Sequence, residues 1–101
     1  MEEYFGSKIK HEAKEIFEKL PTNSFEDHAL GCMVGAFVAD SMGSLVEFET
    51  DKIPEEKLDE VMKMPGGGPH KVGPGQITDD SEMAMSLLWG LTREYKKMED
   101  K

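Results

Sequence analysis

Apolar residues recur at helical spacing in four separate stretches of this chain, and no stretch shows the clear alternation that marks a strand. The first stretch, about Ser7–Leu20, ends where Pro21 would interrupt a helix. A second stretch begins near Ser24, because Ser24 and Asp27 have the spacing of a helix capping box. It continues to Gly43. The first half of the chain is therefore predicted to form two helices joined by a short polar turn.

Two more helices are predicted in the second half of the chain. A short helix starts at Pro54, whose fixed φ suits a first turn, and a longer one runs from about Asp79 to Met98. Residues 64–76 lie between them and contain five glycines and three prolines, a composition that excludes a regular helix or strand. This glycine loop is either a flexible linker or a shaped site loop. The predicted fold class is all-α.

Small residues occur at every fourth position of the second predicted helix, at Gly31, Gly35 and Ala39. This spacing places them on one face, where a neighbouring helix could approach closely. A glycine inside a helix costs about 1 kcal/mol relative to alanine, so its presence calls for a reason. Close packing is the favoured explanation, and a ligand site lined by backbone is the alternative.

The composition narrows the function classes. The 101 residues carry 21 acidic and 12 basic side chains, a net charge of −9, which argues against a nucleic-acid-binding face. The single cysteine, Cys32, excludes an intramolecular disulfide framework and fits a reducing compartment. We find no secretory h-region near the N-terminus and no apolar run of about 18 residues. We therefore expect a cytoplasmic protein with neither nucleic acid nor membrane as a partner.

Acidic residues cluster where the last predicted helix begins. Thr78 suits the N-cap position, and Asp79, Asp80 and Glu82 complement the helix dipole in the first turn. Taken alone, this capping function is the favoured explanation. The alternative is a cation site, because Mg²⁺ prefers oxygen ligands and two adjacent carboxylates repel each other without a cation.

One of the three histidines is a further candidate metal ligand. His70 lies in the glycine loop, where it could be a metal ligand or a substrate contact, although a solvated loop histidine is the favoured interpretation. His11 and His28 fall on polar helix positions and are expected to lie on the surface.

Two blocks, "GCMVGAFVADSMGSLVEF" at residues 31–48 and "GPGQITDDSEMAMSLL" at residues 73–88, together resemble the ADP-ribosylglycohydrolase family. The family typically has a Gly-Asp-x-x-Gly motif followed by a glutamate, and then Pro-Gly-x-x-Thr-Asp-Asp-Thr/Ser-x-Met at the start of a helix. Both blocks occur here in that order. The resemblance implies an orthogonal helical bundle, the N-terminal part of the family's fold.

The resemblance also implies a chemistry for specific residues. Thr78, Asp79 and Asp80 match family ligands of a binuclear Mg²⁺ centre, which alternatively holds Mn²⁺, and Glu47 matches a catalytic glutamate at that centre. The family hydrolyses the glycosidic bond between ADP-ribose and a protein side chain or small acceptor. Expected partners are therefore an ADP-ribosylated protein or an ADP-ribose-like small molecule. Within the same two blocks, the residues predicted to bind substrate are Asp40, Gly75 and Gln76.

The chain departs from the family pattern in two places. Ala39 stands where the family has the glycine of Gly-Asp. The Asp-x-Asp-Ser/Thr motif that completes the family's metal centre is absent, so the second half of the site is missing from this sequence. We therefore expect residues 1–23 to form an N-terminal helical extension and residues 24–101 a partial glycohydrolase domain. This domain is a fragment, a degenerate relative, or part of a split protein that a second chain or a homo-oligomer completes, and hydrolysis by the lone chain is expected to be weak or absent. The alternative is a non-catalytic helical binding or assembly module.

Overall fold

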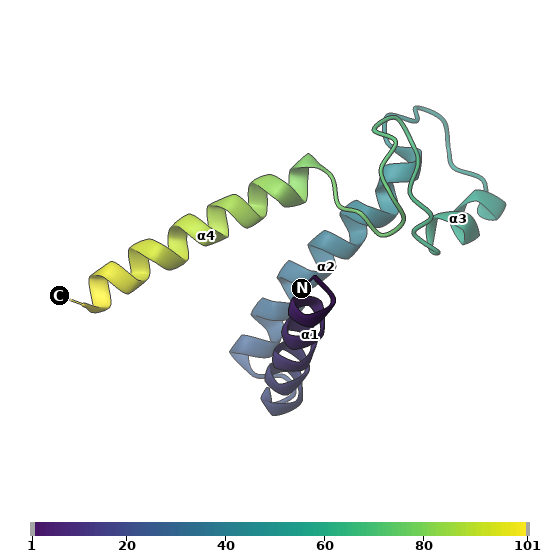
Figure 1. The fold of residues 1–101 in the computed structure, drawn as a ribbon. Helices are drawn as coiled ribbons and strands as arrows, with labels where there is room; N and C mark the ends of the chain where they lie inside the picture. Colours follow the sequence, from purple (N-terminus) through teal and green to yellow (C-terminus); the bar gives the residue numbers. More distant parts are fainter. Residues whose placement is uncertain (1, 101) are drawn as a thin grey trace. The chain divides into compact units, whose positions relative to one another are not determined.

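The computed structural model describes residues 2–100, with side chains from residue 10 onward, and the regular secondary structure of these residues is helical. Its helices are α1 (Glu2–Lys19), α2 (Phe25–Gly43), α3 (Glu55–Val61) and α4 (Asp79–Glu99), and a 3-10 helix, η1 (Ser44–Val46), follows α2 directly (Figure 1). Between residues 2 and 100 the only β-type pairing is an isolated bridge between Gly67 and Val72. The all-α class predicted from the sequence is confirmed.

The predicted helix bounds differ from the structure mainly at the N-terminus. Helix α1 begins at Glu2, ahead of the predicted Ser7, and it ends before Pro21 as expected. Pro54 is the N-cap of α3 rather than part of its first turn, because its ψ of 153° is still extended. Helix α4 begins at Asp79 as predicted and ends within one residue of the predicted end.

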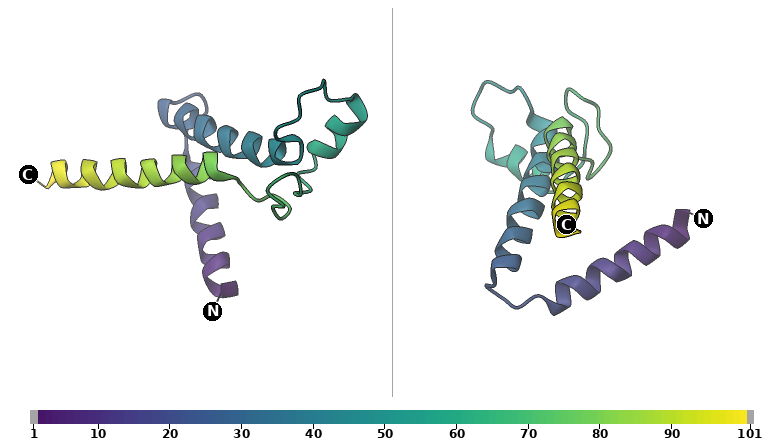
Figure 2. Two further views of the ribbon diagram at one scale, coloured as in Figure 1. Left: turned by 90° about the horizontal axis from the view of Figure 1, so that it is seen from above. Right: turned by 90° about the vertical axis from the view of Figure 1, so that its left-hand side faces the viewer.

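The chain divides into two compact units, residues 1–33 and residues 34–101, and each is described by itself. The second unit holds the end of α2, η1, α3, the glycine loop and α4, and Figure 2 shows that loop leading into the long α4 helix. The predicted domain boundary after residue 23 falls in the turn between α1 and α2 and stays a prediction.

The start of α2 in the first unit has the predicted capping interaction. The hydroxyl of Ser24 accepts a hydrogen bond from the backbone N–H of Asp27 at 3.1 Å. The carboxylate of Asp27 accepts the backbone N–H of Asn23 at 2.9 Å. Asn23 has a φ of 64°, a conformation that asparagine tolerates better than most residues. The local sequence is therefore sufficient to begin this helix.

Polar rather than apolar side chains are the most buried ones described. Val61 is the one buried hydrophobic residue among them, whereas Ser41, Ser44, Thr78 and Ser81 are all buried. The large apolar residues of α4 are exposed, as is Cys32. On α4 the exposed large hydrophobic residues are Met83, Met85, Leu87, Leu88, Trp89, Leu91, Tyr95 and Met98. Residues 10–100 therefore pack most tightly around a polar junction and leave most of their apolar surface uncovered.

The small-residue face of α2 is also uncovered. A Cβ built at Gly31 or at Gly35 would meet nothing within 4 Å. The close packing expected at these glycines does not occur within the described residues.

Helix α2 is long and apolar. By length and composition alone, a helix covering Phe25–Val46 could cross a membrane, contrary to the expectation from the sequence. Core helices of soluble proteins have the same properties. Asp40 near its C-terminal end is hydrogen-bonded to the start of α4, as a core helix of a larger helical protein would be. The expected absence of a membrane partner stays a prediction.

Candidate metal site

Asp40 on α2 holds the acidic turn that begins α4. The backbone N–H of Thr78 donates to Asp40 Oδ2 at 2.9 Å, and the Thr78 hydroxyl donates to Asp40 Oδ1 at 2.5 Å. The Ser81 hydroxyl donates to Asp40 Oδ2 at 2.5 Å. Thr78 thus occupies the predicted N-cap position, but its side chain does not cap the helix. The turn is fixed by a carboxylate from a distant helix instead.

Asp40 is an anionic acceptor in this arrangement. Partial burial by itself raises the pKa of Asp40, but the hydrogen bonds from Ser81 and Thr78 together outweigh that effect and hold the pKa below its ordinary value. Since Thr78 is 6% and Ser81 3% exposed, their hydroxyl groups have little access to water as an alternative partner. Asp40 therefore acts as an anchor that positions the first turn of α4.

The glycine loop has a defined backbone conformation that is closed by hydrogen bonds. Gly67 and Val72 exchange backbone hydrogen bonds of 2.8 and 3.2 Å, and the N–H of Lys71 closes a turn onto the carbonyl of Gly68 at 3.1 Å. Gly68 has a φ of +69°, and a Cβ built there would lie 1.9 Å from the carbonyl oxygen of Ser44. Only glycine permits this close approach. The loop backbone therefore lies directly against η1, the element that precedes Glu47.

His70 lies at the tip of that loop. Pro69 precedes it as the second residue of that turn, a position favoured for proline because its ring fixes φ. The His70 ring lies edge-on to Phe48, with centroids 5.8 Å apart, and its Nε2 is 3.2 Å from Glu47 Oε2. The His70 side chain is 43% exposed. The sequence-based interpretation of a solvated histidine therefore describes its exposure but misses both contacts.

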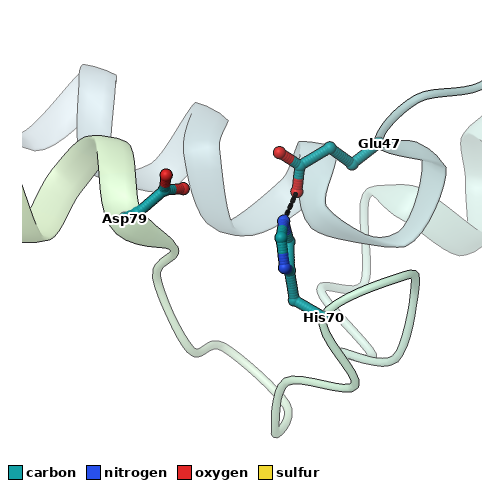
Figure 3. Close-up of side chains that lie close together, drawn as sticks. All are labelled: Glu47, His70 and Asp79. Atoms are coloured by element: carbon teal, nitrogen blue, oxygen red, sulfur yellow. Dashed lines mark ion pairs between the residues drawn. The ribbon is translucent and has the colours of Figure 1, made fainter.

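Glu47, His70 and Asp79 converge from three different segments of the second unit (Figure 3). Their nitrogen and carboxylate ligand atoms all lie within 4.8 Å of one another. Two ligands on opposite sides of a divalent ion, with bonds of about 2.1–2.4 Å, lie roughly 4.2–4.8 Å apart. The spacing is therefore that of groups able to share one cation.

The carboxylate of Glu47 adds a second indication of a cation site. Its Oε2 atom is buried and makes no hydrogen bond with any described residue, although His70 Nε2 is at ion-pair distance. A buried carboxylate oxygen without a hydrogen bond is costly unless a cation or water satisfies it. The residues present therefore fit a divalent metal ion.

The structure brings together two of the predicted site residues, Glu47 and Asp79, and adds His70. Thr78 directs its hydroxyl to Asp40, and exposed Asp80 is not part of the group. The predicted roles of Thr78 and Asp80 as ligands stay predictions.

Two of the predicted substrate-binding residues, Gly75 and Gln76, lie in the glycine loop, and the third, Asp40, lies on α2. Gly75 has a φ of +71° and donates its N–H to the carbonyl of Met64 at 3.0 Å. The side-chain oxygen of Gln76 accepts the N–H of Gly73 at 2.8 Å, so its observed contact lies within the loop. Substrate binding by Asp40, Gly75 and Gln76 stays a prediction.

The chain is thus a helical protein with a candidate divalent-metal site. Two carboxylates and a histidine converge in this site near the start of a helix. Residues 21–101 match the ADP-ribosylglycohydrolase family model, and the chain belongs to this family. The family resemblance drawn from the two sequence blocks is thereby confirmed.

Three relatives illustrate the similarity. The chain is 44% identical over 64 residues to ADP-ribosyl-[dinitrogen reductase] glycohydrolase of Rhodospirillum rubrum, which covers 63% of this chain and 22% of the relative. It is 40% identical over 68 residues to ADP-ribosylarginine hydrolase Tri1 of Serratia proteamaculans, covering 67% and 17%. Its similarity to the hydrolase of the same name from Pseudomonas putida is 36% over 61 residues, covering 60% and 15%. The chain therefore matches about a fifth or less of each relative's length, and no solved structure matches it.

Proposed function

We propose that this chain provides the N-terminal part of the active site of a metal-dependent ADP-ribosylglycohydrolase. The observation that carries the proposal is the convergence of Glu47 and Asp79, which come from two separate family blocks, with ligand atoms within 4.8 Å. The family match over residues 21–101 supports the reaction class. Since two relatives are named ADP-ribosylarginine hydrolases, we propose ADP-ribose linked to an arginine side chain as the substrate to test first.

In this proposal Glu47 and Asp79 hold a divalent cation, and the neighbouring Asp80 is available as a further oxygen ligand. Such an ion, when bound, supplies positive charge that orients ribose hydroxyl groups and a water molecule. Asp40 acts indirectly, because its hydrogen bonds to Thr78 and Ser81 fix the turn from which the Asp79 carboxylate extends.

Glu47 is the residue we assign to proton transfer. Cleavage of a glycosidic bond builds positive charge on the ribose ring, and a carboxylate beside that ring can stabilise the charge and accept a proton from the attacking water. The Glu47 side chain is 24% exposed, so a substrate can reach it. One of its oxygens is buried against the loop, which restricts its orientation. A constrained but accessible carboxylate suits this role.

The remaining ligands and most of the acceptor-side contacts must come from additional polypeptide in this proposal. The exposed apolar side chains of α4 support such a completion, because their burial would supply the core that residues 10–100 lack. The proposed active form therefore contains this chain packed against the remainder of a glycohydrolase fold, in the same or in a second polypeptide.

The test is a chimera that supplies that remainder. The stretch of the Rhodospirillum rubrum enzyme that matches this chain over 64 residues is replaced by the corresponding residues of this chain. Release of free ADP-ribose from an ADP-ribosylated arginine peptide is then measured with and without divalent metal. We expect metal-dependent release that Glu47→Gln lowers by at least about a hundredfold, the low end for loss of a catalytic acid–base group.

Glu49→Gln serves as the matched control, because Glu49 is an exposed glutamate two positions away. A folded chimera that binds metal but releases no ADP-ribose would refute the hydrolase assignment.

One observation favours a second candidate, a non-catalytic assembly module. Leu87, Trp89 and Leu91 on α4 are all more than half exposed, as expected of a surface that binds another helix. An inactive chimera, together with this chain forming a stable complex with the rest of a glycohydrolase, would favour this candidate. Metal-dependent release that requires Glu47 would exclude it.

A further inference from the structure

We propose that Phe48 binds the guanidinium group of an ADP-ribosylated arginine, with its aromatic ring lying against the planar cation. The inference rests on the proposed function and deepens it, because it names a residue that recognises the acceptor side of the substrate. Phe48 directly follows Glu47, the residue assigned to proton transfer. Its side chain is 75% exposed, although phenylalanine is among the residues most often buried.

The backbone conformation of Phe48 is one that a bulky residue rarely adopts. Glu47 and Phe48 are the two central residues of a β-turn, which the N–H of Glu49 closes by donating to the carbonyl of residue 46 at 3.1 Å. Glu47 has a φ of −58° and a ψ of 138°, and Phe48 has a φ of +65°, as in a type II turn. Glycine or asparagine is usual at the third position of this turn, because a larger side chain is strained there. The turn itself therefore gives no reason for a phenylalanine.

Packing among residues 10–100 gives no such reason either, because it leaves the Phe48 side chain mostly exposed. The His70 ring lies beside it, with centroids 5.8 Å apart and an angle of 64° between the planes. This edge contact orients the Phe48 ring and leaves at least one face of it open. Nε2 of the same His70 is 3.2 Å from Glu47 Oε2 (Figure 3). The open aromatic face and the Glu47 carboxylate therefore lie on either side of one imidazole ring.

Position and charge favour the guanidinium over the adenine as the group that binds Phe48. The bond to be cleaved joins the ribose to the guanidinium, whereas the adenine lies at the opposite end of ADP-ribose, beyond the diphosphate. A ring next to Glu47 is therefore near the guanidinium. The neighbouring carboxylates of Glu47, Glu49 and Asp51 attract a cation and repel a diphosphate. A guanidinium lying over an aromatic face is a favourable cation–π arrangement.

The test uses the full 101-residue chain in millimolar MgCl₂, titrated with ADP-ribosylarginine and separately with ADP-ribose, which lacks the guanidinium. Ligand-detected NMR spectroscopy gives both dissociation constants, and an upfield shift of the arginine δ-methylene protons reports contact with an aromatic face. We expect this shift with the unmodified chain and its loss in Phe48→Leu. Phe48→Leu should weaken ADP-ribosylarginine binding about two- to fivefold, as for an exposed cation–π contact, and leave ADP-ribose binding unchanged. Phe48→Trp should retain both the shift and the affinity, because tryptophan is the best aromatic partner for a cation.

Phe25→Leu is the matched control, because Phe25 is also a highly exposed phenylalanine but lies at the start of α2, and it should change neither readout. Equal weakening of both ligands in Phe48→Leu would place the ring against the ADP-ribose part and overturn the inference. ADP-ribosylarginine binding that Phe48→Leu leaves unchanged would overturn it too. No binding of either ligand at millimolar concentration would also overturn it, whereas the activity of the chimera decides the proposed function independently. Circular dichroism of each variant confirms that its helices are retained.

Discussion

Replacing Asp40 tests whether one carboxylate positions the candidate site. Asp40→Ala removes the only described acceptor for three donors, the N–H and hydroxyl of Thr78 and the hydroxyl of Ser81. Asp40→Asn keeps a side chain of the same shape and one acceptor oxygen but loses the charge. The two variants therefore separate the loss of the hydrogen bonds from the loss of charge.

The expected magnitudes follow from burial. Leaving a buried donor unsatisfied costs about 1–3 kcal/mol, and Thr78 and Ser81 are both more than nine-tenths buried. Asp40 itself is only half-buried, so water can partly replace its carboxylate, and the low end of that range applies to each of the three donors. We expect Asp40→Ala to weaken this turn by about 3 kcal/mol, and Asp40→Asn by about 1 kcal/mol.

Hydrogen exchange at the Thr78 amide is the direct assay, because this N–H is bonded to Asp40. A loss of about 3 kcal/mol corresponds to roughly a hundredfold faster exchange, and about 1 kcal/mol to less than tenfold. Asp27→Ala is the control, since Asp27 also accepts a backbone N–H but near the start of α2. Equal exchange rates at Thr78 in Asp40→Ala and in the unmodified chain would refute the anchoring argument.

Three further predictions follow from the site. In a titration of the chain with MnCl₂, Gly68→Ala should weaken Mn²⁺ binding about tenfold or more, because its Cβ would collide with Ser44, whereas Gly75→Ala, with a similar φ but open space, should have little effect. Asp79→Asn should reduce Mn²⁺ affinity more than Asp80→Asn, because only Asp79 lies with Glu47 and His70; equal losses would show that both carboxylates bind the ion. The pKa of Asp40 is lowered in the folded chain, so its stabilising contribution is present above the pKa of an unfolded aspartate and is lost as the pH falls through the folded value. The difference in unfolding free energy between the unmodified chain and Asp40→Asn should therefore shrink on acidification, and a constant difference between neutral and strongly acidic pH would contradict this.

The helices illustrate what local sequence can specify. Ser24 and Asp27 begin α2 through contacts three residues apart, and Pro21 ends the preceding helix, so both features could be read from the sequence. The exposed apolar face of α4 shows the limit of such reading. Its periodicity correctly indicates a helix, but periodicity is the same whether the covering partner belongs to this chain or to another polypeptide.

The conformation of the glycine loop could be known only from the tertiary structure. Its composition excluded regular structure but left a flexible linker and a shaped loop equally open. The contact between Gly68 and Ser44 joins segments distant in sequence, and no local pattern encodes it. For the same reason the sequence favoured a solvated His70. Its place in the glycine loop, between the two family blocks, was the one feature that suggested a ligand.

The sequence by itself determined the helical class and the family, and it predicted Glu47 and Asp79 as site residues, because helix periodicity and motif residues are local properties. The tertiary structure alone decided that Asp40 anchors the acidic turn and that His70 joins the two carboxylates. These relations depend on distances between residues far apart in the chain. Those distances are set by how the backbone packs, and a linear pattern does not contain them.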